Sequence, residues 1–125
     1  MTPDEELRFY LSPLEITGRA SGRASARGVL RSDLASLGGH FPGNPLLAGA
    51  FQLELVAVLA GLVLPEGWRP IRVEHARFRR MVRPGDEVTL EVAVKAQDGD
   101  RATIKASLEA GETRACQATL IFTGP

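Results

Sequence analysis

The 125-residue chain is predicted to fold as one α+β domain, residues 1–125, in which a curved antiparallel β-sheet wraps around one long central α-helix. Residues 46–64 are almost wholly apolar and contain no proline, and this length favours a helix over a strand. A helix that is apolar on all sides is normally buried, as when a sheet wraps it. The segments on either side alternate apolar and polar residues, as strands do.

The part of the chain before the helix contains three short candidate elements. Residues 3–10 are ambiguous, and their alternating apolar side chains indicate a strand. Residues 14–17 and 23–30 predict an antiparallel pair, because turn-type residues separate them. The second strand of this pair has one face of mostly small residues, as expected where a sheet lies close to a helix: Ala24, Ala26, Gly28 and Leu30. Residues 34–37 are predicted to form a short capped turn.

Four strand-like segments follow the helix: residues 71–82, 88–94, 102–108 and 115–122. In the first of them, strict alternation places Val73 and His75 on one face and Phe78 on the other. The Asp98-Gly99-Asp100 sequence predicts a tight hairpin turn between the second and third.

Composition excludes several classes of function. The formal net charge is zero, which argues against nucleic acid as a partner. The single cysteine, Cys116, rules out an internal disulfide and a cysteine-based metal cluster, and no metal-ligand spacing joins His40 to His75. The longest uninterrupted apolar run, residues 55–64, is about half of what a bilayer span needs. No signal peptide is visible, so we expect a cytoplasmic protein that does not enter the membrane.

Three residues near the central helix carry groups suited to acid–base chemistry. Glu54 is a carboxylate among apolar side chains, and such surroundings favour a protonated carboxyl that can serve as a general acid. His40 lies in the loop before the helix, where a neutral imidazole can act as a base. Gly49 lies near the helix N-terminus, where its N–H can point at a ligand oxygen and the helix dipole stabilises negative charge.

Each of these residues also has a simpler explanation. His40 can cap a neighbouring carbonyl, and Glu54 can reach solvent at a subunit edge. Gly49 can serve tight packing of the helix against the sheet, which would offset the cost of about 1 kcal/mol for glycine inside a helix. Gln52 either hydrogen-bonds at an interface or lines a substrate channel.

The sequence His40-Phe41-Pro42-Gly43-x-Pro45, followed by Gly49 and Glu54, resembles the active-site signature of the 3-hydroxyacyl-(acyl-carrier-protein) dehydratases, the FabZ/FabA-like enzymes of the hot-dog fold. The spacing agrees, since Glu54 follows His40 by 14 positions (54 − 40 = 14). A second similar stretch, residues 76–86, follows in the family's order. The resemblance extends from residue 26 to the C-terminus and implies the hot-dog fold.

The resemblance implies dehydration of a 3-hydroxyacyl thioester on acyl carrier protein to the trans-2-enoyl thioester, in fatty-acid or polyketide-type biosynthesis. Carried over to this chain, His40 removes the proton α to the carbonyl, Glu54 protonates the departing β-hydroxyl, and the Gly49 N–H polarises the carbonyl. The other implied substrate contacts are Phe41, Pro42, Gly43 and Gln52. No cofactor is implied.

The resemblance also implies partners. The family builds each site from two protomers, so a homodimer is expected and a trimer of dimers is compatible with it. An arginine-rich segment is either a solvated face or a docking surface for the acidic carrier protein, with Arg77, Arg79 and Arg80 as its candidates.

Three residues depart from the family's pattern. Ala48, Val58 and Met81 stand where the family often has proline, glutamine and proline, and these departures bear on substrate range more than on fold. Two other functions stay open: a hot-dog acyl thioesterase, and a non-catalytic module that binds acyl chains or the carrier protein.

Overall fold

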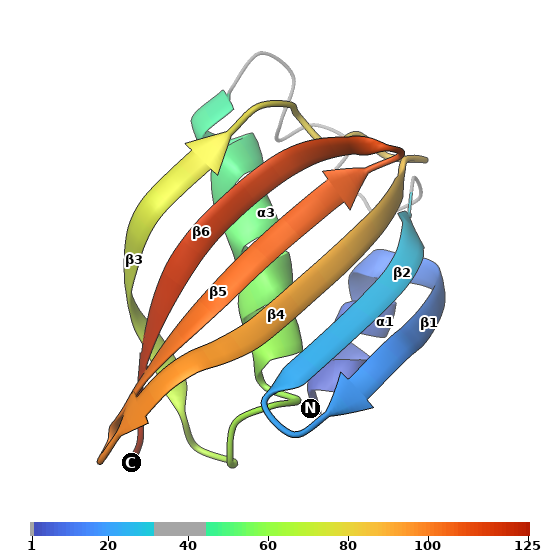
Figure 1. Ribbon diagram of the computed structural model, residues 1–125. Coiled ribbons are helices and arrows are strands. Elements are labelled where there is room, and N and C mark those ends of the chain that lie inside the picture. Colours follow the sequence, from blue (N-terminus) through green and yellow to red (C-terminus); the bar gives the residue numbers. More distant parts are fainter. Residues whose placement is uncertain (1, 32–44) are drawn as a thin grey trace.

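The computed structural model describes the backbone of residues 2–31 and 45–125, and the side chains of residues 2–31 and 49–125 (Figure 1). Two helices and six strands lie within these ranges. In chain order they are α1 (Pro3–Tyr10), β1 (Leu11–Ala20), β2 (Arg23–Leu30), α3 (Pro45–Ala60), β3 (Arg69–Phe78), β4 (Glu87–Asp98), β5 (Arg101–Ala110) and β6 (Thr113–Thr123). The turn predicted at residues 34–37 lies outside them.

The six strands form one antiparallel sheet in the order β1-β2-β4-β5-β6-β3. The strand that follows the helix, β3, therefore lies at the far edge, where it pairs with β6. Figure 1 shows the sheet curving around α3, with α1 beside the β1 edge. This arrangement confirms the predicted α+β class and the single curved sheet around a long helix.

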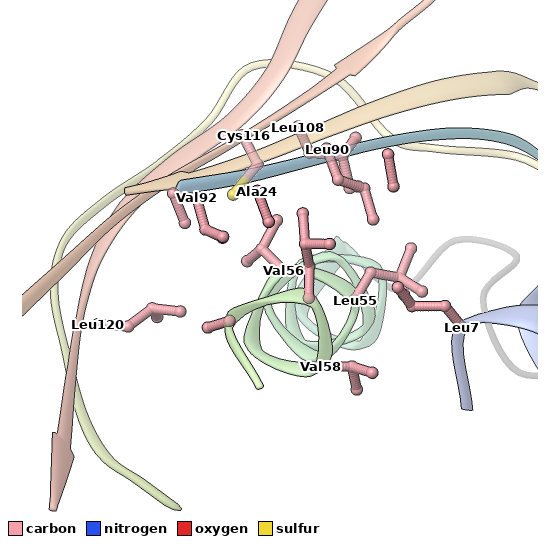
Figure 2. Packing of buried hydrophobic residues seen from close by; sticks show 14 of the residues in the cluster. Leu7, Ala24, Leu55, Val56, Val58, Leu90, Val92, Leu108, Cys116 and Leu120 are labelled. Atoms are coloured by element: carbon pink, nitrogen blue, oxygen red, sulfur yellow. The ribbon is translucent and has the colours of Figure 1, made fainter. Parts of the chain in front are cut away.

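The core lies between the inner face of the sheet and α3. The small-residue face predicted on β2 is buried, with Ala26 and Leu30 at 0% and 1% exposure. In Figure 2, Val56 points from α3 towards Leu90 and the other sheet residues, whereas Leu55 points towards Leu7 of α1. Val58 lies on the side of α3 away from the sheet. Both the sheet and α1 thus cover parts of the helix.

The prediction that α3 is buried on all sides and runs to residue 64 is wrong on both counts. Ala50 and Glu54 are exposed, because the helix surface between α1 and β3 is left open in the single chain. The helix ends at Ala60. Three i→i−3 hydrogen bonds then tighten the chain, donated by the N–H groups of Gly61, Leu62 and Val63. No helix among the described residues is long and apolar enough to cross a membrane.

Residues 3–10, predicted as a strand, form the helix α1. The Thr2 hydroxyl accepts a hydrogen bond from the Glu5 N–H (3.1 Å), and the Glu5 carboxylate accepts one from the Thr2 N–H (3.2 Å). This is a capping box, and Pro3 occupies the first helical turn, where its missing N–H has no cost. The buried Leu7 then fixes α1 against α3.

We expect Thr2→Ala to lower the free energy of unfolding by about 1 kcal/mol, because it leaves a helix N–H without its cap. Urea unfolding of the two proteins measures the difference. The hydrogen bond from the Thr2 N–H lowers the pKa of Glu5 below its usual value of 4.5. The stabilisation from this half of the capping box is therefore present above pH 4.5 and is lost as the pH falls through the lowered pKa. An unfolding midpoint unchanged by Thr2→Ala would contradict a stabilising role for α1.

The strand β3 ends at Phe78, not at residue 82, and its alternation is broken. Glu74 pairs with Thr119 and Arg77 with Gln117, so β3 contains one residue more than β6 between these pairs. The extra residue forms a β-bulge, where His75 adopts a φ of 53°. The predicted common face of Val73 and His75 is therefore not a regular one.

Candidate active site

The predicted site residues fall into two groups. His40, Phe41, Pro42 and Gly43 lie outside the described residues. Gly49, Gln52 and Glu54 lie on α3 and each has different surroundings. Within the described ranges, no three His, Cys, Asp or Glu side chains are arranged to hold a metal ion.

Gly49 is buried in the second turn of α3, against the edge strand β3. A Cβ placed on this glycine would lie 3.3 Å from the Cε1 and Cζ atoms of Phe78, the last residue of β3. The absence of a side chain thus allows a close approach of the Phe78 ring to the helix, which supports the packing explanation for this glycine. Phe78 keeps 46% of its surface exposed, so its ring also faces out of the chain.

The position of Gly49 bears on the role implied for its N–H. In a helix that begins at Pro45, the N–H of the fifth residue, Gly49, already has a regular partner, the carbonyl of Pro45 four residues before it. Donation to a thioester carbonyl therefore requires a shared, three-centre hydrogen bond, of the kind common at helix ends. The helix dipole favours negative charge at this end of α3.

Gly49→Ala separates packing from catalysis. Alanine gains about 1 kcal/mol of helix propensity, while the Phe78 ring must move by a few tenths of an ångström to admit the methyl group. We therefore expect stability to change by less than about 1 kcal/mol, and kcat/KM for the proposed reaction to fall at least tenfold because the methyl group and the displaced ring obstruct the substrate. Thermal melts and initial rates measure the two effects.

The matched control is Gly49→Ala combined with Phe78→Leu, which removes the crowding but keeps the methyl group on the helix. Recovery of activity in the double variant would assign the loss to the displaced ring. Full activity in Gly49→Ala alone would leave this glycine with packing as its only role.

Gln52 is buried, at 1% exposure, and connects α3 to the segment after β3. Its Nε2 donates a hydrogen bond to the Arg80 carbonyl (2.9 Å). Its Oε1 accepts no hydrogen bond from the described residues. The side chain thus has a structural contact, while the implied contact with substrate stays a prediction.

Glu54 is exposed, and this corrects the expectation of a carboxyl enclosed by apolar side chains within the chain. It borders a hollow of about 240 Å³ between α1, α3 and the β3 edge. Most of the residues around this hollow are apolar: Pro3, Ala57, Val58, Gly61, Trp68, Pro70 and Phe122. Glu6 of α1 is the other carboxylate there. The apolar helix thus presents its one charged side chain to an open, mainly apolar hollow.

Tyr10 was not identified from the sequence, and it lies within electrostatic range of Glu54. Its ring packs edge-to-face against Phe51 of α3, with ring centroids 5.3 Å apart. Burial raises the pKa of the Tyr10 phenol, and the charges of Glu54 and Glu6 raise it further. The phenol is therefore held in its neutral, hydrogen-donating form beside the two carboxylates.

The three candidate docking arginines have different surroundings. Arg80 donates to the Ala110 carbonyl (3.2 Å) and pairs with Asp86 (3.4 Å), which also accepts a hydrogen bond from the Arg83 N–H (2.9 Å). Arg80 therefore helps to hold the segment between β3 and β4. Arg77 and Arg79 are exposed and form no ion pair within the part of the chain that the structure describes. These two side chains are the ones available for docking.

A long helix held in one curved six-stranded antiparallel sheet defines the hot-dog fold, as the resemblance implied. The ApeI-like family model, described as ApeI dehydratase, matches residues 17–118. The chain belongs to this family of dehydratases. This assignment and the curated relatives below confirm the resemblance drawn from residues 40–54.

Curated relatives agree with this assignment. The chain is 34% identical over 91 residues to the 3-hydroxyacyl-(acyl-carrier-protein) dehydratase FabZ of Levilactobacillus brevis, which covers 67% of this chain and 62% of the relative. The FabZ of Chloroflexus aggregans is 37% identical over 91 residues, covering 67% and 63%. The chain thus spans about three fifths of the length of these relatives.

The dehydratase heterocomplex ApeI:P from Xenorhabdus doucetiae has a similar fold. It superposes with a TM-score of 0.73 at 14% identity, covering 99% of this chain and 88% of that one.

Proposed function

We propose that this chain catalyses dehydration of a 3-hydroxyacyl thioester on acyl carrier protein to the trans-2-enoyl thioester, in fatty-acid or polyketide-type biosynthesis. The observation that carries the proposal is the position of Glu54. It is a lone carboxylate on an apolar helix, it faces a mainly apolar hollow, and it lies five residues after a glycine that packs against Phe78. Membership of a dehydratase family supports the proposal.

In the proposed reaction, the His40 imidazole takes the proton from the carbon α to the thioester carbonyl. The electron pair of that C–H bond forms the α–β double bond, while the bond from the β carbon to its hydroxyl breaks. The Glu54 carboxyl gives its proton to the departing hydroxyl, which leaves as water. Proton transfer from the imidazolium to the carboxylate then returns both groups to their starting forms.

A general acid must be protonated when the substrate is bound, and in the single chain Glu54 is exposed to water in an open hollow. An acyl chain and a second protomer placed over the hollow would exclude water from the carboxyl and favour its neutral form. The proposed mechanism therefore requires that the site be covered when it is active.

We propose a homodimer as the covering arrangement. The strand β3 is at the edge of the sheet and carries three large, exposed apolar side chains: Ile71, Val73 and Phe78, at 44%, 43% and 46% exposure. An exposed apolar edge strand readily pairs with another chain. The proposed dimer pairs two such edges, and the resemblance implies that each site then combines His40 of one protomer with Glu54 of the other. A trimer of such dimers is compatible with this pairing.

The proposed partner is an acyl carrier protein, whose acidic surface would meet the exposed arginines at the end of β3. Arg77 and Arg79 lie beside Phe78, so a carrier docked there would present its acyl arm close to Gly49. Charge attraction of this kind mainly raises the association rate. Because such substrates are built where the carrier protein resides, we infer a cytoplasmic location.

The deciding experiment incubates the purified chain with 3-hydroxyacyl thioesters of several chain lengths and follows the enoyl absorbance. Appearance of the enoyl thioester, and hydration of added enoyl thioester in reverse, is the expected result. Release of free acid would assign the chain to the thioesterases. Binding of carrier protein with no turnover at any chain length would make it a binding module.

A further inference from the structure

The outer face of the sheet carries a second hollow that the proposed reaction does not use. In Figure 1, β4, β5 and β6 pass in front of α3, so the outer face is the one seen. A shallow groove of about 490 Å³ lies on this face. Its lining comes from β1, β2, β4, β5 and β6, and the apolar β3 edge takes no part in it.

Outward-facing residues that lie opposite one another on neighbouring strands form a row across the sheet. The first row of this groove is cationic. Arg23 on β2 and Lys105 on β5 both lie opposite Ala93 of β4, so their backbones are about 10 Å apart with one small side chain between them. Lys95 borders the same groove. None of these three cations forms an ion pair with the residues that the structure describes. A bound anion would relieve their mutual repulsion and accept charged hydrogen bonds.

The second row carries hydrogen-bonding groups. Ser25 and Ser107 flank Glu91 across the sheet, and Gln117 lies opposite Ser107. The Thr17 hydroxyl donates to the Ser25 oxygen (2.9 Å), which leaves the Ser25 hydrogen free to donate. Arg114 donates to the Gln117 oxygen (3.0 Å), so the amide nitrogen of this residue is also available as a donor. Glu91 is the one acceptor-only group in the row.

The third row of outward-facing residues has no such unpaired cations among the charges that the structure describes. There Arg27 pairs with Glu15 (3.2 Å), and Arg114 pairs with Glu109 (3.5 Å). Charges in that row are thus neutralised within the chain, whereas the charges of the first row are not. The first and second rows are two residues apart along each strand, which is about 7 Å.

We propose that this groove binds a sugar phosphate, alone or as part of a nucleotide. The phosphate contacts Arg23, Lys105 and Lys95. The sugar hydroxyls lie over the second row, where Glu91 accepts their hydrogen bonds and Ser25, Ser107 and Gln117 donate. The spacing of the two rows suits a phosphate and the hydroxyls of the sugar that carries it. The groove volume lies within the range of small-molecule sites.

The test titrates the full chain with ribose 5-phosphate, followed by backbone amide NMR shifts. Saturable binding with shifts confined to the groove strands is expected. Lys105→Gln should weaken binding about tenfold. The matched control is Arg101→Gln, which removes a cation from the same strand and the same face but outside the groove. It should change binding less than about twofold. Both changes are on exposed side chains, and circular dichroism checks the folds.

A change at Glu91 separates a sugar phosphate from phosphate alone. Glu91→Gln should weaken ribose 5-phosphate, which loses its hydroxyl acceptor, and strengthen inorganic phosphate, which loses a repelling charge. If adenosine 5′-monophosphate binds more tightly than ribose 5-phosphate, the site is assigned to nucleotides. If the two bind equally, the site is assigned to sugar phosphates.

Three results would overturn the proposal. The first is that neither sugar phosphate binds saturably up to about 20 mM. The second is that Lys105→Gln and Arg101→Gln weaken binding equally, and the third is that Glu91→Gln raises the affinity for both ribose 5-phosphate and inorganic phosphate.

Discussion

Glu54→Gln is expected to lower kcat/KM for the dehydration by about 10²- to 10⁴-fold, the usual contribution of a positioned general acid. Glutamine has nearly the same shape as glutamate but cannot give a proton to the departing hydroxyl. Because the side chain keeps its size and shape, the substitution should leave the thermal melting temperature almost unchanged. Initial rates with a 3-hydroxyacyl thioester measure the effect.

Glu6→Gln is the matched control, because this second carboxylate borders the same hollow from α1. It changes the local charge as Glu54→Gln does but is not placed in the reaction, so its rate should stay within about threefold of the natural protein. Equal losses of activity in the two variants would mean that the negative charge beside the hollow matters, and not proton transfer from Glu54. A Glu54→Gln protein with more than a tenth of the natural activity would remove Glu54 from the mechanism.

His40→Ala should cause a loss of similar size, and the double variant should lose little more than either single one. Residues that act as a unit in one step give strongly non-additive losses, because the step already fails when the first is removed. Losses that simply multiply would mean that His40 and Glu54 act in separate steps.

The sheet was predictable because its strands follow a simple period. From β4 to β6 the inward residues are apolar and most of the outward ones polar, and tight turns separate the strands. The helix α1 was missed because its apolar residues are too few to establish a helical period. Its start signal was nevertheless in the sequence, since Thr2, Pro3 and Glu5 form the capping pattern. A short element is better identified by its cap than by its period.

The residues of the candidate site stay a prediction, and the exposure of Glu54 could not be predicted from the sequence. The sequence of α3 is apolar all round, so its periodicity cannot show which face the sheet covers. Only the fold reveals that the face carrying Glu54 is open between α1 and β3. The same holds for the arginines, since the contact of Arg80 with the Ala110 carbonyl depends on strand order, which a linear charge pattern does not contain.

The proposed homodimer would explain both the open face of α3 and the apolar edge of β3, because a second copy of the chain would cover both. Apolar side chains are then left on a sheet edge because they are buried in the dimer. An all-apolar helix is left partly open because its last face is closed by the partner. Under this explanation, the monomer contains the acid but not a complete site.

Val73→Lys tests this explanation directly. A charged side chain in the middle of β3 should prevent edge pairing, so the protein is expected to sediment at the 13.4-kDa mass of one chain and to lose at least about 100-fold in activity. Phe9→Lys is the matched control, because Phe9 is equally exposed, at 47%, but lies on α1. It should remain dimeric and active. A dimeric, active Val73→Lys protein would place the interface elsewhere.

Mixing two inactive variants tests whether the site is shared. If His40 of one protomer works with Glu54 of the other, a heterodimer of His40→Ala and Glu54→Gln has one site with both changes and one site with neither. Random exchange of equal amounts makes half of the dimers heterodimers, so about a quarter of the natural activity should return, as follows from two-fold symmetry. If both residues belong to the same protomer, every site in the mixture keeps one change, and no activity returns. Recovery of activity would therefore show that each active site is formed by two protomers, so that catalysis requires the dimer.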